Sequence, residues 1–189
     1  MKELRIAELR ALDNENMVVE GYAVVFDNTT DLGYRKEVID KNAFEGCDMS
    51  DVCMKYNHSD ELLIMARTRN NSLQLFVDER GLRIRAELID TTQNRDLYKM
   101  IQSRLLDKMS FAFTVAEEDI DYETDTRRIK RIDKLYDVAV VDVPAYESTS
   151  IYARNKEQFD EEKRKYEENK EAYKKLELEK KKALALLSL

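Results

Sequence analysis

The chain has 189 residues, of which 43% are hydrophobic and 38% are charged, and its formal net charge is −7. This length allows one domain with a substantial core plus an appendage. Residues 154–182 carry 11 Lys/Arg and 9 Asp/Glu, so the acidic excess lies in the rest of the chain, which argues against nucleic acid as its main partner.

The first third of the chain predicts short strands separated by turns. Residues 17–26 are rich in β-branched and aromatic side chains and predict a strand, in which Gly21 indicates a bulge or a bend. A short strand is expected over 37–39 and one helical turn over 42–47. Residues 52–57 then lead into His58, while residues 4–12 fit either a strand or a short helix.

The middle of the chain predicts an antiparallel meander followed by a helix. Apolar runs at 62–68, 73–77 and 82–89 are joined by tight polar turns. Residues 90–93 resemble a capping box, and leucine and isoleucine then recur every four residues to about residue 107. That spacing is typical of an amphipathic helix.

A second group of strands follows the helix. In Met109-Ser110-Phe111-Ala112-Phe113 the large apolar residues alternate with small ones, which predicts a strand with Ser110 on the face opposite the core. Polar residues 121–126 predict a hairpin turn, residues 135–143 a strand ended by Pro144, and residues 151–152 an edge strand. The fold class expected is α+β, mainly β: a small antiparallel β-barrel with at least one packed helix, over residues 1–153.

Residues 154–189 form a different kind of segment. They contain no glycine or proline, and aromatic residues recur every seven positions at Phe159, Tyr166 and Tyr173. This pattern predicts a long charged helix with a thin apolar seam, compatible with a weak coiled coil. Such a helix buries too little apolar surface to be stable alone, so we expect it to be marginal until it meets a partner.

Several classes of site are disfavoured by composition. Cys47 and Cys53 are too few and too oddly spaced for a disulfide framework or a zinc cage. Only four glycines and one histidine are present, without a phosphate-binding glycine loop, so we expect no cofactor and no metal. The chain shows no signal-peptide pattern and no apolar run that could span a membrane, so we expect a soluble intracellular protein without membrane contact.

The candidate catalytic residues are His58, Ser110 and Asp137. A serine hydroxyl is a weak nucleophile near neutral pH and needs a base, commonly a histidine that a third group orients. His58 is the one histidine, and Ser110 and Asp137 both lie on predicted strands. The residue types alone leave a second interpretation open, in which His58 is structural, Ser110 merely begins a strand and Asp137 forms a salt bridge.

The ordered motifs of the chain resemble those of a known family, the prohead proteases of tailed bacteriophages, which are related in fold to the herpesvirus assemblins. The resemblance runs from about Glu20 to Tyr152 and rests on segments in family order: Gly21–Phe26, Glu37–Phe44, Asn57-His58, Met109–Phe113, Asp137–Val141 and Pro144–Tyr146. The family usually has glutamate at the third catalytic position, where this chain has Asp137, and it has glycines where this chain has Asn42 and Ala112.

The resemblance implies a serine endopeptidase with Ser110 as nucleophile, His58 as general base and Asp137 as the third member. It implies cleavage of scaffold, or of the scaffolding segment of the major capsid protein, and of the protease itself, inside the assembling prohead in the host cytoplasm. Self-association is also expected. The helical tail would place the protease in the shell, although a solvated helix or a disordered linker explains its composition equally well.

Two other classes of function remain open from sequence. One is a non-catalytic capsid-assembly module that binds through the barrel and the tail. The other is a generic binding barrel with an oligomerising helix. Both differ from the peptidase in predicting that Ser110 and His58 are dispensable.

Overall fold

The computed structural model describes residues 9–12, 16–62, 64–142, 160–172 and 174–175 of the chain. The chain divides into two compact units, residues 1–147 and 148–189. The expected boundary at residues 153/154 and the expected strand at 151–152 lie outside the described residues. The described residues of the first unit form two β-sheets, one α-helix and a 3-10 turn at Thr68–Asn70, and they include all three candidate catalytic residues.

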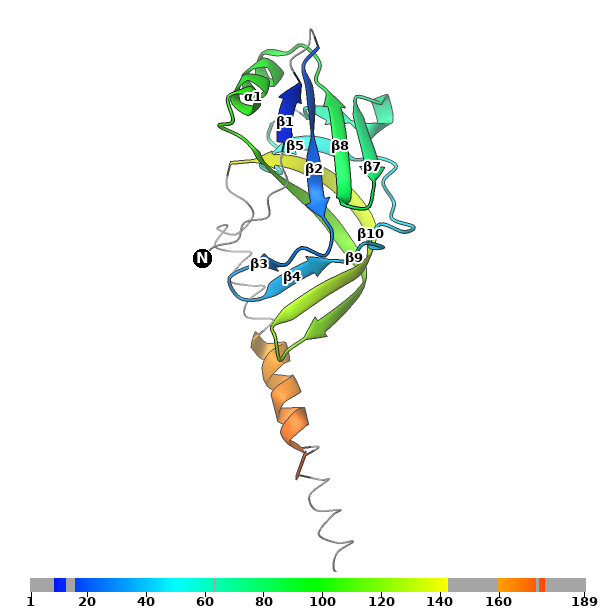
Figure 1. Ribbon diagram of the computed structural model, residues 1–189, viewed down its shortest axis with the longest axis vertical. Coiled ribbons are helices and arrows are strands. Elements are labelled where there is room, and N and C mark those ends of the chain that lie inside the picture. The colour runs from blue at the N-terminus through cyan, green and yellow to red at the C-terminus, as the bar shows by residue number, and fades with distance from the viewer. Residues whose placement is uncertain (1–8, 13–15, 63, 143–159, 173, 176–189) are drawn as a thin grey trace, which may run out of the picture. The chain divides into compact units, whose positions relative to one another are not determined.

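The first sheet is an antiparallel sheet of four strands (Figure 1). Its strands, in spatial order, are β1 (Leu9–Leu12), β2 (Val18–Val25), β8 (Gly81–Glu87) and β7 (Leu73–Val77). The alternation predicted for β8 is confirmed, because Leu82, Ile84 and Ala86 are all buried. In β2 the pairing shifts register between Tyr22 and Val24, next to the glycine at which a bulge was expected.

The second sheet is built around the long hairpin of β9 (Lys108–Asp121) and β10 (Thr126–Val141). Along its other edge β10 pairs first with β4 (Lys36–Ile39) and then with β5 (Cys53–Tyr56), and both pairings are parallel. Two short strands, β3 (Thr30–Asp31) and β6 (Ala66–Arg67), extend the sheet beyond β4 and β5. The sheet is therefore mixed, whereas the sequence predicted antiparallel strands only.

The described strands do not close into the expected barrel. They form two sheets with no strand pairing between them. The break falls between β6, which pairs with β5 of the second sheet, and β7, which pairs with β8 of the first. The predicted meander over 62–89 is thus wrong at its first strand, of which only Ala66 and Arg67 form a β-ladder. Regular strand spacing indicates how many strands there are but not which of them pair. Residues 42–47, expected as a helical turn, form hydrogen-bonded turns.

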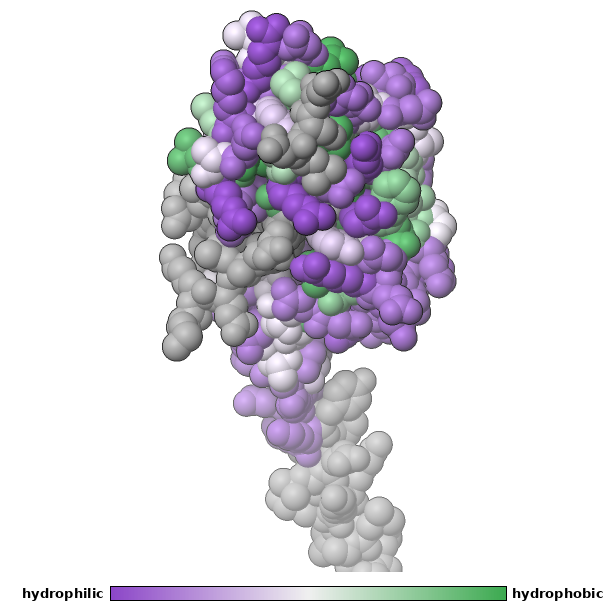
Figure 2. All heavy atoms as spheres, turned by 45° about the horizontal axis from the view of Figure 1, so that its top comes forward, coloured by the Kyte–Doolittle hydropathy of each residue, from purple (hydrophilic) through white to green (hydrophobic). Residues whose placement is uncertain are grey.

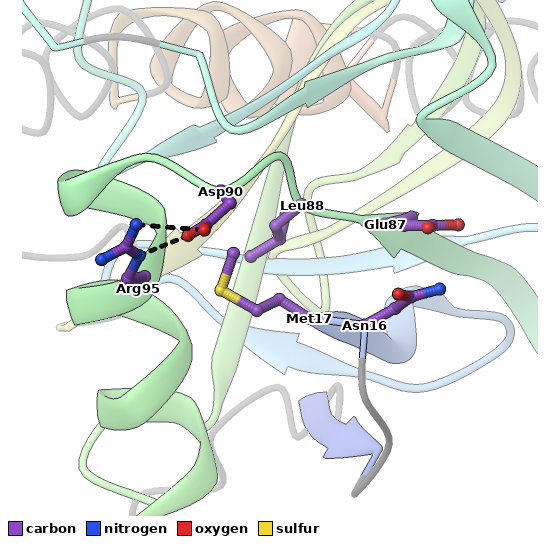
Figure 3. A pocket seen from close by; sticks show the side chains of 6 residues that line it. All are labelled: Asn16, Met17, Glu87, Leu88, Asp90 and Arg95. Carbon is purple, nitrogen blue, oxygen red and sulfur yellow. Dashed lines mark hydrogen bonds and ion pairs between the residues drawn. The ribbon is translucent and has the colours of Figure 1, made fainter.

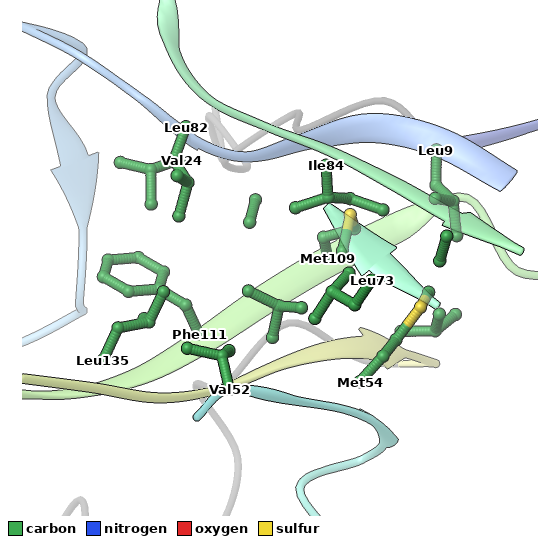
Figure 4. Close-up of a cluster of buried hydrophobic side chains, with 14 of the residues drawn as sticks. Leu9, Val24, Val52, Met54, Leu73, Leu82, Ile84, Met109, Phe111 and Leu135 are labelled. Atoms are coloured by element: carbon green, nitrogen blue, oxygen red, sulfur yellow. The ribbon is translucent and has the colours of Figure 1, made fainter. Parts of the chain in front are cut away.

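The hydrophobic core lies between the two sheets. Figure 4 shows Leu9, Val24, Leu82 and Ile84 of the first sheet facing side chains that come from β5, β9 and β10 and from the segment before β5. The side chains of the second layer include Val52, Met54, Met109, Phe111 and Leu135, all buried. The apolar residues at the start of β9 therefore face the core, as their alternation predicted, and the first sheet lies across that core.

Helix α1 (Thr92–Gln102) packs against this core through Leu97 and Ile101. Thr91 caps its first turn by accepting a hydrogen bond from the backbone N–H of Asn94 at 3.2 Å. The helix ends five residues before the predicted end, because Arg104 adopts a left-handed conformation with φ of 60°. Leu105, predicted as part of the buried stripe, consequently lies beyond the helix and is exposed.

In the second unit, residues 160–172 and 174–175 are helical. Lys165 forms an ion pair with Glu161 one turn earlier, at 2.8 Å. The remainder of the long helix expected over 154–189 lies outside the described residues.

None of the described helices is long and apolar enough to cross a membrane. The surface seen in Figure 2 is mostly hydrophilic, with apolar residues in small separate groups.

Between β4 and β5 the chain stays hydrogen-bonded to β10. The N–H of Ile132 donates to the carbonyl of Ala43 at 2.7 Å, and the N–H of Leu135 donates to that of Asp48 at 3.0 Å. The side chain of Asp48 accepts hydrogen bonds from Ser50 and binds the Lys134 ammonium at 2.9 Å. These partners hold the pKa of Asp48 well below its ordinary value of 3.8.

We expect Gly81→Ala to destabilise the protein by about 3 kcal/mol, because a Cβ there would lie 1.9 Å from the carbonyl oxygen of Val24, a backbone atom that cannot easily move. Gly46→Ala is the comparison. Gly46 has φ of +75° but open space around it, so its cost is conformational only, about 1 kcal/mol. Urea unfolding of both variants measures the difference, and a smaller loss at Gly81 than at Gly46 would contradict this packing.

We expect Asp48→Asn to be less stable than the wild type at pH 7 and to approach it in acid. Because the folded-state pKa of Asp48 is lowered, its contribution is present above the unfolded pKa of 3.8 and is lost as the pH falls through the lower folded value. Urea midpoints of both proteins between pH 7 and pH 2 test this. A gap between them that widens in acid would show that the carboxylate is not the stabilising form.

Candidate active site

Ser110 lies on β9 with its side chain turned away from the core. Its neighbours Met109 and Phe111 are 2% and 7% exposed, whereas Ser110 and Ala112 are half-buried on the other face. Phe111 and Phe113 stack with ring centroids 4.6 Å apart. The predicted alternation therefore places the Ser110 hydroxyl on the face of the second sheet that lies opposite the core.

Asp137 reaches that same face because β10 is bulged. On β10, the side chains that face the hydrophobic core lie three positions apart. They are Ile129, Ile132, Leu135 and Val138, and all four are buried. Regular alternation would put every second residue there, so an extra residue must be inserted at each step. The register shift between Leu135 and Asp137 is one such insertion. It turns Val138 into the core and Asp137 away from it.

The pairing register places Ser110 and Asp137 diagonally across two neighbouring strands. Ser110 pairs with Ala139 and Asp137 pairs with Ala112. Paired residues of neighbouring strands share a face, and diagonal neighbours lie roughly 7 Å apart. The two candidate residues are thus adjacent in the same sheet face, although they are distant in sequence.

His58 is delivered to this face by a tight turn at the end of β5. Asn57 and His58 both adopt positive φ, 51° and 53°. The N–H of Asn57 donates to the carbonyl of Val140 at 2.9 Å, and its side-chain oxygen accepts a hydrogen bond from the N–H of Asp142 at 3.2 Å. These two bonds tie the turn to the end of β10. Positive φ is uncommon for histidine, so the surrounding bonds must enforce it.

The imidazole of His58 contacts Asp137 directly. Nδ1 lies 2.5 Å from Oδ1 of Asp137, whose side chain is 8% exposed, while that of His58 is 29% exposed. An ionised carboxylate only accepts hydrogen bonds, so Nδ1 carries the proton and donates it to Asp137. The other ring nitrogen, Nε2, is then left with a free lone pair. In a neutral imidazole with this tautomer, Nε2 is the nitrogen that can accept a proton.

The structure therefore joins two of the three predicted residues and places the third beside them. Between the described side chains of Ser110 and His58 there is no hydrogen bond. Contacts of this kind are often long before substrate binds.

Lys55 is a fourth side chain at this site, and it was not predicted from the sequence. Its Nζ is 3.8 Å from Oδ2 of Asp137 and 2.5 Å from Oδ1 of Asp60. The hydrogen bond with Asp60 raises the pKa of Lys55 and lowers that of Asp60. Side chains alternate along β5, so Lys55 lies on the same face of the strand as Cys53. This alternation was the feature of the sequence that could have indicated Lys55.

The basic run after residue 126 is engaged elsewhere in the hairpin. Arg127 binds Glu37 at 3.2 Å and also Glu118, and Arg128 binds Asp27 at 2.8 Å. Arg127 pairs with β4, in the half of β10 that does not carry Asp137. These ion pairs engage both arginines away from the candidate catalytic residues.

A pocket of about 410 Å³ lies at the ends of β2 and β8 beside α1 (Figure 3). Two of its charged residues are already partnered, since Arg95 forms a bidentate ion pair with Asp90, with Nη2 3.0 Å from Oδ2. None of the three candidate catalytic residues lines it. Within the described part of the chain, no group of three or more His, Cys, Asp or Glu side chains could hold a metal ion.

Comparison with known proteins agrees with the motifs. The family described as caudovirus prohead serine protease matches residues 5–165 of the chain. The prohead protease of Enterobacteria phage HK97 is 30% identical over 145 residues, which cover 75% of this chain and 61% of that protein. The chain thus spans about three fifths of the length of this curated relative. No solved structure matches significantly.

The family match covers most of the chain, and the structure brings the histidine and the aspartate together on the sheet face that carries the serine. The chain therefore belongs to the caudovirus prohead serine protease family.

Proposed function

We propose that this chain is a serine endopeptidase of phage capsid maturation, with Ser110 as nucleophile, His58 as general base and Asp137 as the residue that orients His58. The observation that carries the proposal is the 2.5 Å contact between His58 Nδ1 and Asp137 Oδ1, on the sheet face that Ser110 shares. Membership of a serine protease family supports the choice of Ser110 as nucleophile.

The chemistry follows from the positions of these groups. Nε2 of His58 takes the hydroxyl proton as Oγ of Ser110 attacks a peptide carbonyl. The imidazolium then returns that proton to the leaving amine, and an acyl ester remains on Ser110. A water molecule, deprotonated by His58, attacks the ester. The imidazolium then returns this proton to Oγ of Ser110 as the new carboxyl terminus is released. Backbone N–H groups are our proposed donors to the oxyanion.

The proposed substrates are scaffold, or the scaffolding segment of the major capsid protein, and the protease itself. The name of the HK97 relative, a prohead protease, supports an action inside the assembling prohead, and hence in the host cytoplasm. We also propose that the protease associates with itself. In this proposal the tail, residues 154–189, places the peptidase domain, residues 1–153, within the shell. The competing function is a non-catalytic assembly module.

We expect Ser110→Ala to abolish cleavage when the chain is co-expressed with the major capsid protein of the same phage. The variant removes the only atom that can form the acyl ester, while the small side chain remains half-buried on its strand. Intact mass of both chains is the measurement. Ser103→Ala is the matched control, because Ser103 caps the C-terminal end of α1, and it should process normally. Equal masses for wild type and Ser110→Ala, with shells still forming, would favour the assembly module.

We expect Asp137→Asn to lower kcat by about 10³- to 10⁴-fold, because the amide no longer holds the proton on Nδ1. Asp137→Glu keeps the carboxylate that the family commonly has at this position, and it should retain far more activity. Both are measured on a peptide spanning the mapped cleavage site. A slowing of less than tenfold in Asp137→Asn would remove Asp137 from the proposed triad.

A further inference from the structure

Lys55 lies between two carboxylates in very different environments. Its Nζ is 2.5 Å from Oδ1 of Asp60, whose side chain is 90% exposed, and 3.8 Å from Oδ2 of Asp137, whose side chain is 8% exposed. The other oxygen of Asp137 is occupied by His58. Each oxygen of the buried carboxylate therefore faces its own cationic or proton-donating partner.

The strand register explains why Lys55 reaches this carboxylate. On β5, Cys53 pairs with Asp137 and Lys55 pairs with Ala139. Paired residues share a face of the sheet, so Lys55 lies on the face of Asp137, three residues before His58. Lys55 and Asp60 bracket the left-handed turn at Asn57 and His58, and their ion pair closes that turn.

The groups that face Asp137 can be named element by element. Strand β5 contributes Cys53 and Lys55, and the following turn contributes His58 and, through Lys55, Asp60. Strand β9 contributes Ala112 and Ser110, which carry no charge. Asp142 follows β10 and accepts a hydrogen bond from the Tyr56 hydroxyl at 3.3 Å. Among the described residues, Lys55 is the one Lys or Arg whose cationic nitrogen lies within 4.0 Å of Asp137.

The balance of charge at this point matters to a general base. A buried carboxylate next to an imidazole stabilises the imidazolium, and an imidazolium cannot accept a proton from serine. A cation on the second oxygen weakens that stabilisation and also favours the ionised form of the buried carboxyl. Both effects preserve neutral His58 with its Nδ1 proton held by Asp137.

We propose that Lys55 is a positioning residue of this site, which ties Asp137 to the turn after His58 and limits how strongly Asp137 stabilises the imidazolium. The inference rests on the proposed function, in which His58 is the general base. Lys55 acts through Asp137 and His58 and does not itself touch the scissile bond.

The single histidine of the chain makes a direct test possible. In the full-length Ser110→Ala protein, purified without a histidine tag, every imidazole proton resonance comes from His58. Its NMR titration midpoint should rise by about one pH unit in Lys55→Met, because the charge of Asp137 is then uncompensated. Lys55→Arg should stay close to the parent, and Asp137→Asn should move the midpoint the other way.

The matched control is Lys130→Met. Lys130 also lies on the second sheet and pairs with a single carboxylate, that of Asp119, at 2.5 Å, but in the hairpin half of β10. It should leave the midpoint unchanged. Lys55→Gln is prepared alongside, so that a folded neutral variant exists if Lys55→Met does not fold. A midpoint that does not rise in the folded neutral variant, or rises equally in Lys55→Arg, overturns the inference.

Cleavage rates separate this inference from the proposed function. With Ser110 restored, the acid limb of kcat/KM should move to higher pH in the neutral Lys55 variant, with KM little changed. Cleavage by wild type with no movement of that limb overturns the role of Lys55 and leaves the peptidase standing. A shifted His58 titration in a protein that cleaves nothing supports the coupling of Lys55 to His58 and overturns the proposed function.

Discussion

The hydrogen bonding of β10 is the constraint on which the larger unit depends. One edge of this strand pairs with β9 along its length, and the other edge is shared by β4, the segment around Asp48 and β5. Because β10 is bulged repeatedly, its core-facing residues from Ile129 to Val138 recur every three positions, and the strand can bend while it keeps both ladders. Every element of the second sheet is positioned by this strand, either directly or through one intervening strand.

The candidate site is a consequence of that strand. Ser110 comes from the antiparallel neighbour of β10, His58 from the end of its parallel neighbour, and Asp137 from β10 itself. The three side chains therefore share a rigid three-stranded frame whose other face is packed into the core. A frame of this kind suits chemistry that needs groups held within fractions of an ångström. Of the three candidate residues, His58 alone does not lie on a strand but in a short left-handed turn with Asn57.

How much could be predicted from the sequence differs from element to element. The alternation of Met109 and Phe111 with Ser110 predicted the face of Ser110, because β9 has a regular pleat at that point. The same rule fails for Asp137, since alternation from the buried Leu135 would have put Asp137 in the core, and only the bulge at Tyr136 prevents this. That His58 and Asp137 meet followed from the order of family motifs and not from any local pattern. The parallel pairing of β4 and β5 with β10 leaves no local signal at all, and for this reason an antiparallel barrel was expected.

The parallel pairing of β5 with β10 also bears on when the site can form. The paired residues 53–56 and 137–140 are separated by more than eighty positions, with β7 and β8 of the first sheet, α1 and β9 between them. Contacts between segments so far apart carry a large loop-closure cost and form late in folding. During synthesis, His58 emerges well before its aspartate partner exists, and a chain cut short before β10 has no complete triad. Assembly of the candidate site thus requires β10 to be made and paired with β5, so the proposed peptidase cannot act before the fold is complete.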